Sequence, residues 1–207
     1  MIIVVEGISA SGKTKWCSEH GGDHVIPEAG KVLDAPDCEK DPFAAAAFWS
    51  VRNAQRWQAA LVAEAKTGLA ICDTDPVKLH YDWCLWQIGE ASEQQWRHAL
   101  NFTRESLLAG RVGLADSYFV KEIDPPLARL QRDGDATRAR RNFELHLRLQ
   151  SPLIAWYEAL GAALPGRVKF SLPTEWALPA GSGPKDGRYD VVAFDHAINL
   201  LPAVRAF

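Results

Sequence analysis

Several features that mark other classes of protein are missing from this chain of 207 residues. No apolar run approaches the roughly 18–20 residues of a membrane-spanning helix. The formal net charge is −3, so no basic excess favours binding to nucleic acid through its phosphates. The four cysteines show no Cys-x-x-Cys spacing, and the first residues lack the basic region of a signal peptide. We therefore expect a cytoplasmic protein with reduced, buried thiols and no membrane or nucleic-acid partner.

The most informative segment that is present is residues 7–14, Gly-Ile-Ser-Ala-Ser-Gly-Lys-Thr, which fits the phosphate-binding pattern GxxxxGK[ST]. An apolar run at residues 1–5 predicts a buried strand before it, and residues 13–20 predict a helix after it. In this context the backbone N–H groups of the loop point at one phosphate site. Lys13 is expected to reach the β- and γ-phosphates, and the Thr14 hydroxyl to bind Mg²⁺. The residues predicted to bind ATP are Gly7, Ser9, Ala10, Ser11, Gly12, Lys13 and Thr14.

Strand-like and helix-like segments alternate along the chain, and 47% of its residues are apolar, which is enough for a packed core. The alternation predicts an α/β fold in which helices cover a parallel sheet, and the length suits one domain over residues 1–207. Five strands are predicted, at residues 2–5, 24–27, 69–72, 113–123 and 168–172.

The longest predicted helix covers residues 43–67. Its apolar side chains recur every three or four residues, so Phe43, Val51 and Trp57 are expected to face the core. Further helices are predicted at residues 77–88, 92–108, 138–150 and 195–201.

Two acidic segments follow predicted strands. Asp73 comes directly after residues 69–72, Asp75 lies two residues later, and Glu28 follows the strand at residues 24–27. Ligands of open α/β sheets collect at the carboxyl ends of the strands, so we expect Asp73 to help bind Mg²⁺. Glu28 or Asp75 is expected to accept the proton of an acceptor hydroxyl. The alternatives are an Asp-Thr-Asp turn that caps the next helix, and a loop carboxylate or substrate contact for Glu28.

Five arginines lie within residues 129–141, around an Asp-Gly-Asp turn. This pattern predicts a lid over residues 129–142 that closes on the polyphosphate, with Arg132, Arg138 and Arg141 neutralising charge in the transition state. Guanidinium groups suit phosphate geometry better than ammonium groups do. The alternative is a solvated helix face whose arginines pair with acidic neighbours, Asp133, Asp135 and Glu144.

Three segments together resemble thymidylate kinases and deoxynucleoside kinases of the P-loop group. They are residues 5–8, which lead into the loop, residues 58–73 before and through the third strand, and residues 116–132. The resemblance covers about residues 1–160 and is most specific at the phosphate-binding loop. It implies a three-layer fold with a five-stranded parallel sheet, the loop strand in the middle and a mobile, Arg-rich lid.

Two short segments depart from the thymidylate kinase pattern. Asp73 is followed by Thr74 and Asp75, which is closer to the nicotinamide-riboside kinases than to an Asp-Arg or Glu-Arg pair. Residues 27–30 read Pro-Glu-Ala-Gly where the thymidylate enzymes carry Glu-Pro-Gly. The resemblance therefore leaves the acceptor open.

The helices that follow the second and third strands wall the acceptor pocket in such folds, and in this chain they are rich in aromatic residues that stack on flat rings. The predicted acceptor-binding residues are Trp49, Arg52, Arg56, Tyr81, Trp83 and Trp86. At least one of the three tryptophans is expected to touch the acceptor, with a place in the core as the alternative. One of the two arginines is expected to bind the acceptor, with an exposed position on the helix as the alternative. The loop at residues 173–187 is the expected base-recognition segment, and its sequence does not indicate which base it would bind.

The balance of charged residues favours a hydroxyl acceptor over a phosphate acceptor, because carboxylates outnumber arginines on the acceptor side. The sequence thus predicts an ATP- and Mg²⁺-dependent kinase that phosphorylates a small, ring-bearing, nucleoside-like molecule, with a homodimer as one possible assembly. Two alternatives stay open: a nucleoside monophosphate kinase of the thymidylate type, and a regulatory P-loop ATPase without a small-molecule acceptor.

Overall fold

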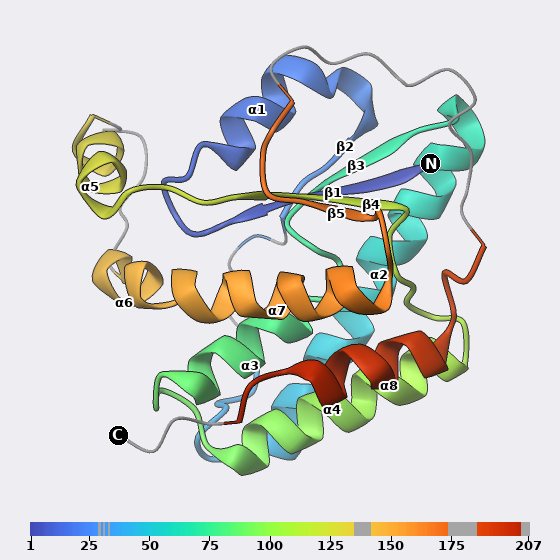
Figure 1. Ribbon diagram of the computed structural model, residues 1–207. Coiled ribbons are helices and arrows are strands. Elements are labelled where there is room, and N and C mark those ends of the chain that lie inside the picture. The colour runs from blue at the N-terminus through green and yellow to red at the C-terminus, as the bar shows by residue number, and fades with distance from the viewer. Residues whose placement is uncertain (29, 31, 33, 135–141, 174–185, 204–207) are drawn as a thin grey trace.

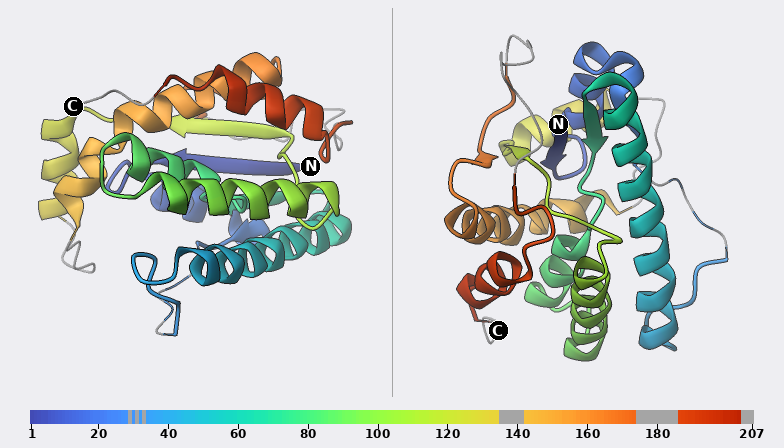
Figure 2. Two further views of the ribbon diagram at one scale, coloured as in Figure 1. Left: turned by 90° about the horizontal axis from the view of Figure 1, so that it is seen from below. Right: turned by 90° about the vertical axis from the view of Figure 1, so that its right-hand side faces the viewer.

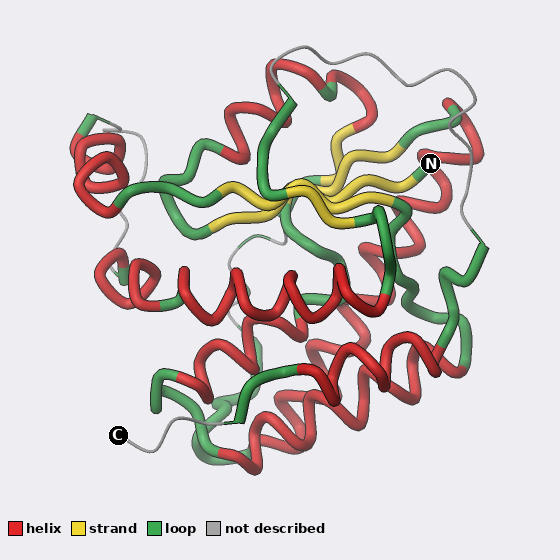
Figure 3. Tube along the Cα trace, viewed as in Figure 1, coloured by secondary structure: helices red, strands yellow, loops and turns green. Residues whose placement is uncertain are grey.

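The computed structural model describes residues 1–207 except 29, 31, 33, 135–141, 174–185 and 204–207. The described part contains a five-stranded parallel sheet in the order β2-β3-β1-β4-β5 (Figures 1 and 3). Its strands are β1 (Ile2–Gly7), β2 (Val25–Ile26), β3 (Ala70–Asp73), β4 (Ser117–Lys121) and β5 (Val168–Lys169). The strand before the phosphate-binding loop therefore lies in the middle of the sheet, as the resemblance implied.

Helices connect the strands and cover both faces of the sheet. They are α1 (Lys13–His20), the 3₁₀ turn η1 (Gly22–His24), α2 (Pro42–Thr67), α3 (Leu79–Gln87), α4 (Glu93–Leu108), α5 (Pro125–Asp133), α6 (Phe143–Arg148), α7 (Gln150–Ala163) and α8 (Val191–Leu200). Figures 1 and 2 show α1 on one side of the sheet and α3, α4, α7 and α8 on the other. The predicted three-layer α/β architecture is confirmed.

The central strand explains this layering. Ile2 and Val4 point into the large core formed with the helices of the second layer, whereas Ile3 and Val5 point to the opposite face under α1. All four side chains have no exposed surface. A continuous apolar run is typical of a parallel strand that is covered on both faces, because neither side of it meets water.

The ends of β4 and β5 differ from the prediction. Residues 113–116 were expected in a strand, but Leu114 N–H donates to the Arg188 carbonyl at 2.7 Å and Ala115 N–H to the Tyr118 hydroxyl at 2.8 Å. These groups are therefore not available to a neighbouring strand. β5 ends at Lys169, and Phe170 is half exposed.

The buried face of α2 is also different from the predicted one. Phe43 and Val51 are 58% and 59% exposed, so the prediction that they face the core is wrong. Trp57 is buried as expected, and its neighbour Arg56 is buried with it. The helix is rotated so that this arginine reaches carbonyl groups at the end of the sheet.

Two further sequence predictions concern thiols and membranes. Cys17, Cys72 and Cys84 are buried and free, but Cys38 is exposed, so the expectation of buried thiols fails for that residue. Within the described ranges, no helix has both the length and the hydropathy to cross a membrane.

Candidate functional site

The phosphate-binding loop connects β1 to α1, and its backbone includes residues in the left-handed conformation. Ala10 has φ 66° and Gly12 has φ 90°, both in the left-handed region. Ser11 N–H donates to the Ile8 carbonyl at 3.2 Å, which folds the loop over the helix N-terminus. A side chain at Gly7 would meet the Lys121 carbonyl oxygen at 2.8 Å, so only glycine fits there. Left-handed residues beside a helix N-terminus are typical of a nest of N–H groups that can bind phosphate oxygens.

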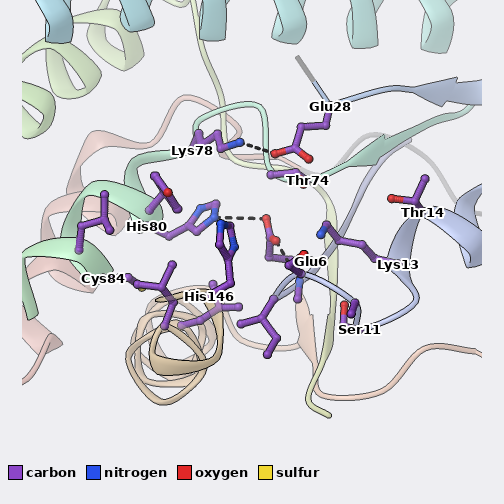
Figure 4. Close-up of a pocket in the computed structure, with 18 of the residues that line it drawn as sticks. Glu6, Ser11, Lys13, Thr14, Glu28, Thr74, Lys78, His80, Cys84 and His146 are labelled. Carbon is purple, nitrogen blue, oxygen red and sulfur yellow. Dashed lines mark hydrogen bonds and ion pairs between the residues drawn. The ribbon is translucent and has the colours of Figure 1, made fainter. Parts of the chain in front are cut away.

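The loop forms one wall of a cavity of about 1130 Å³. Opposite walls come from the segment after β2, from α2 and α3, and from the described parts of the predicted lid. Figure 4 shows the side chains that project into this space. Outside the loop, the lining residues used below are Glu6, Glu28, Trp49, Arg56, Lys78, His80, Tyr81, Asp82, Gln131 and His146.

Asp73 lies at the end of β3, beside the first turn of α1. It is 5% exposed, and its Oδ1 has no hydrogen-bond partner. Burial raises the pKa of this carboxyl, while the Thr14 hydroxyl and the charge of Lys13 act in the opposite direction. The structure thus brings Asp73 close to the two loop side chains expected to bind the metal and the phosphates.

The side chain of Asp75 points into the protein interior. Its Oδ1 accepts the Val77 N–H at 2.9 Å, and its Oδ2 accepts the Tyr157 hydroxyl at 3.4 Å. Burial raises the pKa of this carboxyl to about 7. Asp75 is not among the lining residues of the cavity.

Arg56 holds the ends of two strands together. Its guanidinium donates to the carbonyls of Asp73 at 2.9 Å and Thr74 at 3.0 Å, and more weakly to those of Asp75 and Pro27 at 3.3 Å. Thr74 has φ 75°, a strained value for a β-branched residue, and these bonds hold it there. Arg56 therefore positions the β3 loop, and its donors are already occupied.

Glu28 reaches the cavity from the segment after β2. Its Oε1 accepts a short hydrogen bond from the Lys78 ammonium, and the side chains are 42% and 31% exposed (Figure 4). Burial pushes the pKa of Glu28 upward, but Lys78, Lys13 and Arg56 together hold it below its usual value. Glu28 is therefore ionised at neutral pH.

The cavity also contains a buried polar pair. Glu6, the last side chain before the loop glycine, accepts the N–H groups of Gly7 at 2.9 Å and Asp75 at 3.1 Å. His80 Nε2 lies 3.3 Å from Glu6 Oε2. Burial lowers the pKa of His80 to about 4, so the imidazole is neutral at pH 7. The pair links the phosphate-binding loop to α3.

The predicted aromatic residues separate into two groups. Trp49 and Tyr81 line the cavity, but Trp83 and Trp86 do not. Trp83 is 2% exposed and packs 5.9 Å from Trp156, and Trp86 stacks on Trp96 at the same distance between ring centroids.

Arg52 and Asp82 lie on α2 and α3, the two helices expected to wall the acceptor pocket. Arg52 places its guanidinium over the Phe48 ring at 5.6 Å and is not among the lining residues. Asp82, one residue after Tyr81, lines the cavity, and burial raises its pKa to about 7 against the charge of Lys78. No side chain in the described part of the chain forms an ion pair or hydrogen bond with this carboxyl.

The described arginines of the predicted lid are bound to acidic residues. Arg129 pairs with Glu144 at 2.9 Å, and Arg132 pairs with Asp133 at 2.7 Å and with Glu144 at 3.3 Å. Instead, Gln131 and His146 face the cavity from this side. Arg138 and Arg141 lie outside the described residues, as does most of the loop at residues 173–187.

Sequence reasoning missed Glu6, Lys78, His80, Asp82 and His146. Only Glu6 has a local signal, since it is a single charged residue at the end of an apolar run that enters the loop. His80, Asp82 and His146 lie on helices, and Lys78 directly precedes α3 with a left-handed φ of 53°. Their residue types are ordinary at such positions, and only the packing turns them toward the cavity.

No family model matches the chain, and no curated protein matches its sequence. Two solved structures of deoxyadenosine kinase from M. mycoides are similar in fold. The structure with bound dATP has a TM-score of 0.60 and 12% identity, over 86% of this chain and 93% of that chain. The structure with the products dCMP and a flexible dCDP has a TM-score of 0.58 and 14% identity, over 86% and 92%. The chain therefore has the fold of these P-loop deoxynucleoside kinases, as its sequence motifs predicted.

Proposed function

We propose that this protein is an ATP-dependent phosphotransferase that moves the γ-phosphoryl group to a hydroxyl of a small, nucleoside-like molecule. The observation that carries the proposal is a single cavity that contains a complete phosphate-binding loop, the carboxylate of Glu28 and the rings of Trp49 and Tyr81. Phosphoryl transfer to a hydroxyl needs these three elements: a phosphate cradle, a carboxylate that accepts a proton and a surface that positions the acceptor.

The loop backbone would bind the phosphates of ATP, and Lys13 would stabilise the transferring group. Mg²⁺ fits beside it, because Asp73 offers a buried carboxylate oxygen without a partner and Thr14 offers a hydroxyl. The described residues contain no cluster of three His, Cys, Asp or Glu side chains. A site of one carboxylate and one hydroxyl is typical of Mg²⁺, which takes its other ligands from water and phosphate and neutralises phosphate charge.

Glu28 is the carboxylate that we assign to the acceptor hydroxyl. It lines the cavity and is ionised, whereas Asp75 is hydrogen-bonded inside the protein. The hydrogen bond that Glu28 accepts from Lys78 has to lengthen or break when a hydroxyl approaches the carboxylate. The ammonium can then remain close to the reacting oxygen without blocking it, because its stem is long and flexible.

The lid remains part of the proposal. Arg132, Arg138 and Arg141 would supply cations to the transition state after the segment closes. For Arg132 this requires exchanging its surface partners, Asp133 and Glu144, for phosphate oxygens. Exposed ion pairs contribute little to stability, so this exchange is energetically accessible.

The arrangement of cations favours a hydroxyl over a phosphate acceptor. A nucleoside monophosphate kinase needs arginines free to hold the acceptor phosphate, but Arg56 is bound to carbonyls and Arg52 is not among the residues that line the cavity. A regulatory ATPase needs no acceptor wall, and it would leave Glu28, Trp49 and Tyr81 in the cavity without a role.

The test is ADP release from ATP·Mg²⁺ with a panel of nucleosides, nucleoside monophosphates and other ring-bearing alcohols. Wild type is compared with Lys13→Ala and with Lys66→Ala, whose side chain is exposed on α2 and does not line the cavity. We expect acceptor-dependent release that is lost in Lys13→Ala and kept in Lys66→Ala. Release that no acceptor stimulates would favour the regulatory ATPase, and a preference for monophosphates would favour the nucleotide kinase.

A further inference from the structure

His146 is a polar group of the cavity that the proposed mechanism does not use. It lies on α6, directly after the arginine-rich segment, and lines the cavity with a half-buried imidazole (Figure 4). Its ring centroid is 6.2 Å from that of Tyr81, with the planes tilted by 36°. Among the described residues neither ring nitrogen has a hydrogen-bond partner, so both remain available to a ligand.

The helix α6 presents two different faces. Glu144 is exposed and pairs with Arg129 and Arg132 on the outside. His146 is two residues later, which on an α-helix is a rotation of about 200°. The imidazole therefore faces the cavity because the salt-bridged side of the same helix faces solvent. From the described part of the lid side, an imidazole and not a guanidinium reaches the acceptor wall.

The surroundings of His146 determine its chemistry. Burial lowers its pKa, and the charges of Lys13 and Lys78 add to this effect while Glu28 opposes it. The imidazole is consequently neutral at pH 7, with one N–H donor and one nitrogen acceptor. A hydroxyl group also donates and accepts, so it is the natural partner for such a ring.

We propose that His146 contacts the acceptor directly and hydrogen-bonds one of its hydroxyl groups beside the ring of Tyr81. This inference rests on the proposed function, since it concerns the acceptor of that reaction. The phosphate-binding loop and the imidazole approach the cavity from different elements, and His146 lies against the acceptor wall. Its removal is therefore expected to weaken acceptor binding and not ATP binding.

The kinetic test uses His146→Ala, His146→Gln and the matched control His196→Ala, whose side chain is exposed on α8. For His146→Ala we expect the acceptor KM to rise about tenfold, the equivalent of one good hydrogen bond. The ATP KM should stay within about twofold. Gln keeps a donor and an acceptor, so it should recover part of the loss. An unchanged acceptor KM, or an equal rise in the ATP KM, would overturn the inference.

A second measurement does not depend on turnover. In protein with isotope-labelled histidine, the ring signal of His146 is identified by its absence in His146→Gln and followed by NMR during titration with nucleosides. We expect it to shift on binding, while the signal of His196 does not. A wild-type protein that binds a nucleoside without a shift at His146 would refute the contact.

The two measurements separate the two proposals. A shift at His146 without acceptor-dependent ADP release would leave this contact standing and reject the kinase. Acceptor-dependent release that His146→Ala does not affect would reject the contact and leave the kinase standing. A protein that neither binds nor phosphorylates any member of the panel would reject both.

Discussion

The neutral state of His80 predicts a specific pH dependence of stability. The imidazole is 4% exposed, and burial lowers its pKa from 6.5 to about 4. Between these values the unfolded chain binds a proton on this histidine and the folded protein does not. The free energy of unfolding therefore falls as pH decreases through this window. At about 1.4 kcal/mol per pKa unit, the full effect is on the order of 3 kcal/mol.

Other groups act against this slope, so wild type alone does not isolate it. The pKa values of Asp75 and Asp82 are raised to about 7, and the folded protein holds protons on them that the unfolded chain releases above its normal value near 3.8. Their contribution to stability therefore falls as pH rises toward 7. The two effects partly cancel over the same range.

His80→Gln removes the titration and keeps an N–H donor for Glu6 at the position of Nε2. Urea unfolding of both proteins from pH 7.5 to 4.5 gives the difference in unfolding free energy at each pH. We expect the variant to become more stable relative to wild type by roughly 2–3 kcal/mol as pH falls over this range, because only wild type loses the contribution of the neutral imidazole. His196→Gln serves as the exposed control. A difference that stays constant across the range would refute the buried, neutral state of His80.

The charged groups lead to further predictions. Glu28→Gln should lower kcat by about 10²–10⁴. Lys78→Met removes the charge that lowers the pKa of Glu28, so it should move the acid limb of the kcat/KM profile to higher pH; an unmoved limb would exclude Glu28 as the base. Asp82→Asn should reduce the preference for acceptors with a ring amino group by about tenfold relative to acceptors with a ring carbonyl, and equal losses for both would mean that Asp82 does not face the ring. Arg188→Ala removes the bidentate partner of the buried carboxylate of Asp116 and of the half-buried carboxylate of Glu64, and it should cost about 3–5 kcal/mol in urea unfolding. Arg104→Ala, which removes only a surface ion pair, should cost much less.

The donor half of the site could be predicted from the sequence because it depends on local order. A run of apolar residues, a glycine loop and a helix start are contiguous, so the positions of Lys13 and Thr14 follow from their neighbours in the chain. Asp73 was predictable for a related reason: parallel strands bring their carboxyl ends to one edge of the sheet. One strand is enough to place such a residue near the loop.

The acceptor half could not be predicted in the same way, because it depends on which side of each helix faces the cavity. Tyr81 and Trp83 are two residues apart on α3, and packing sends the first to the cavity and the second to the core. On α2, a helical period identified Trp57 correctly but selected Val51, which is exposed. The carbonyls that hold Arg56 determine that rotation, and they lie 17–29 positions away in the sequence.

The polar groups in and beside the cavity indicate, by complementarity, which ligands it would bind. A buried polar atom without a partner costs free energy, so a site that keeps such atoms favours the molecule that supplies the partners. In the described part of the chain, Asp73 Oδ1 lacks a partner close to Thr14. The half-buried carboxyl of Asp82, next to Tyr81, has no partner among the described side chains and a hydrogen bond only from its own backbone. A cation close to the phosphates would complement Asp73 Oδ1, and an N–H donor on a ring would complement the carboxyl of Asp82. Under the proposed function, these groups and His146 would complement an acceptor that carries both a hydroxyl and an amino-substituted ring.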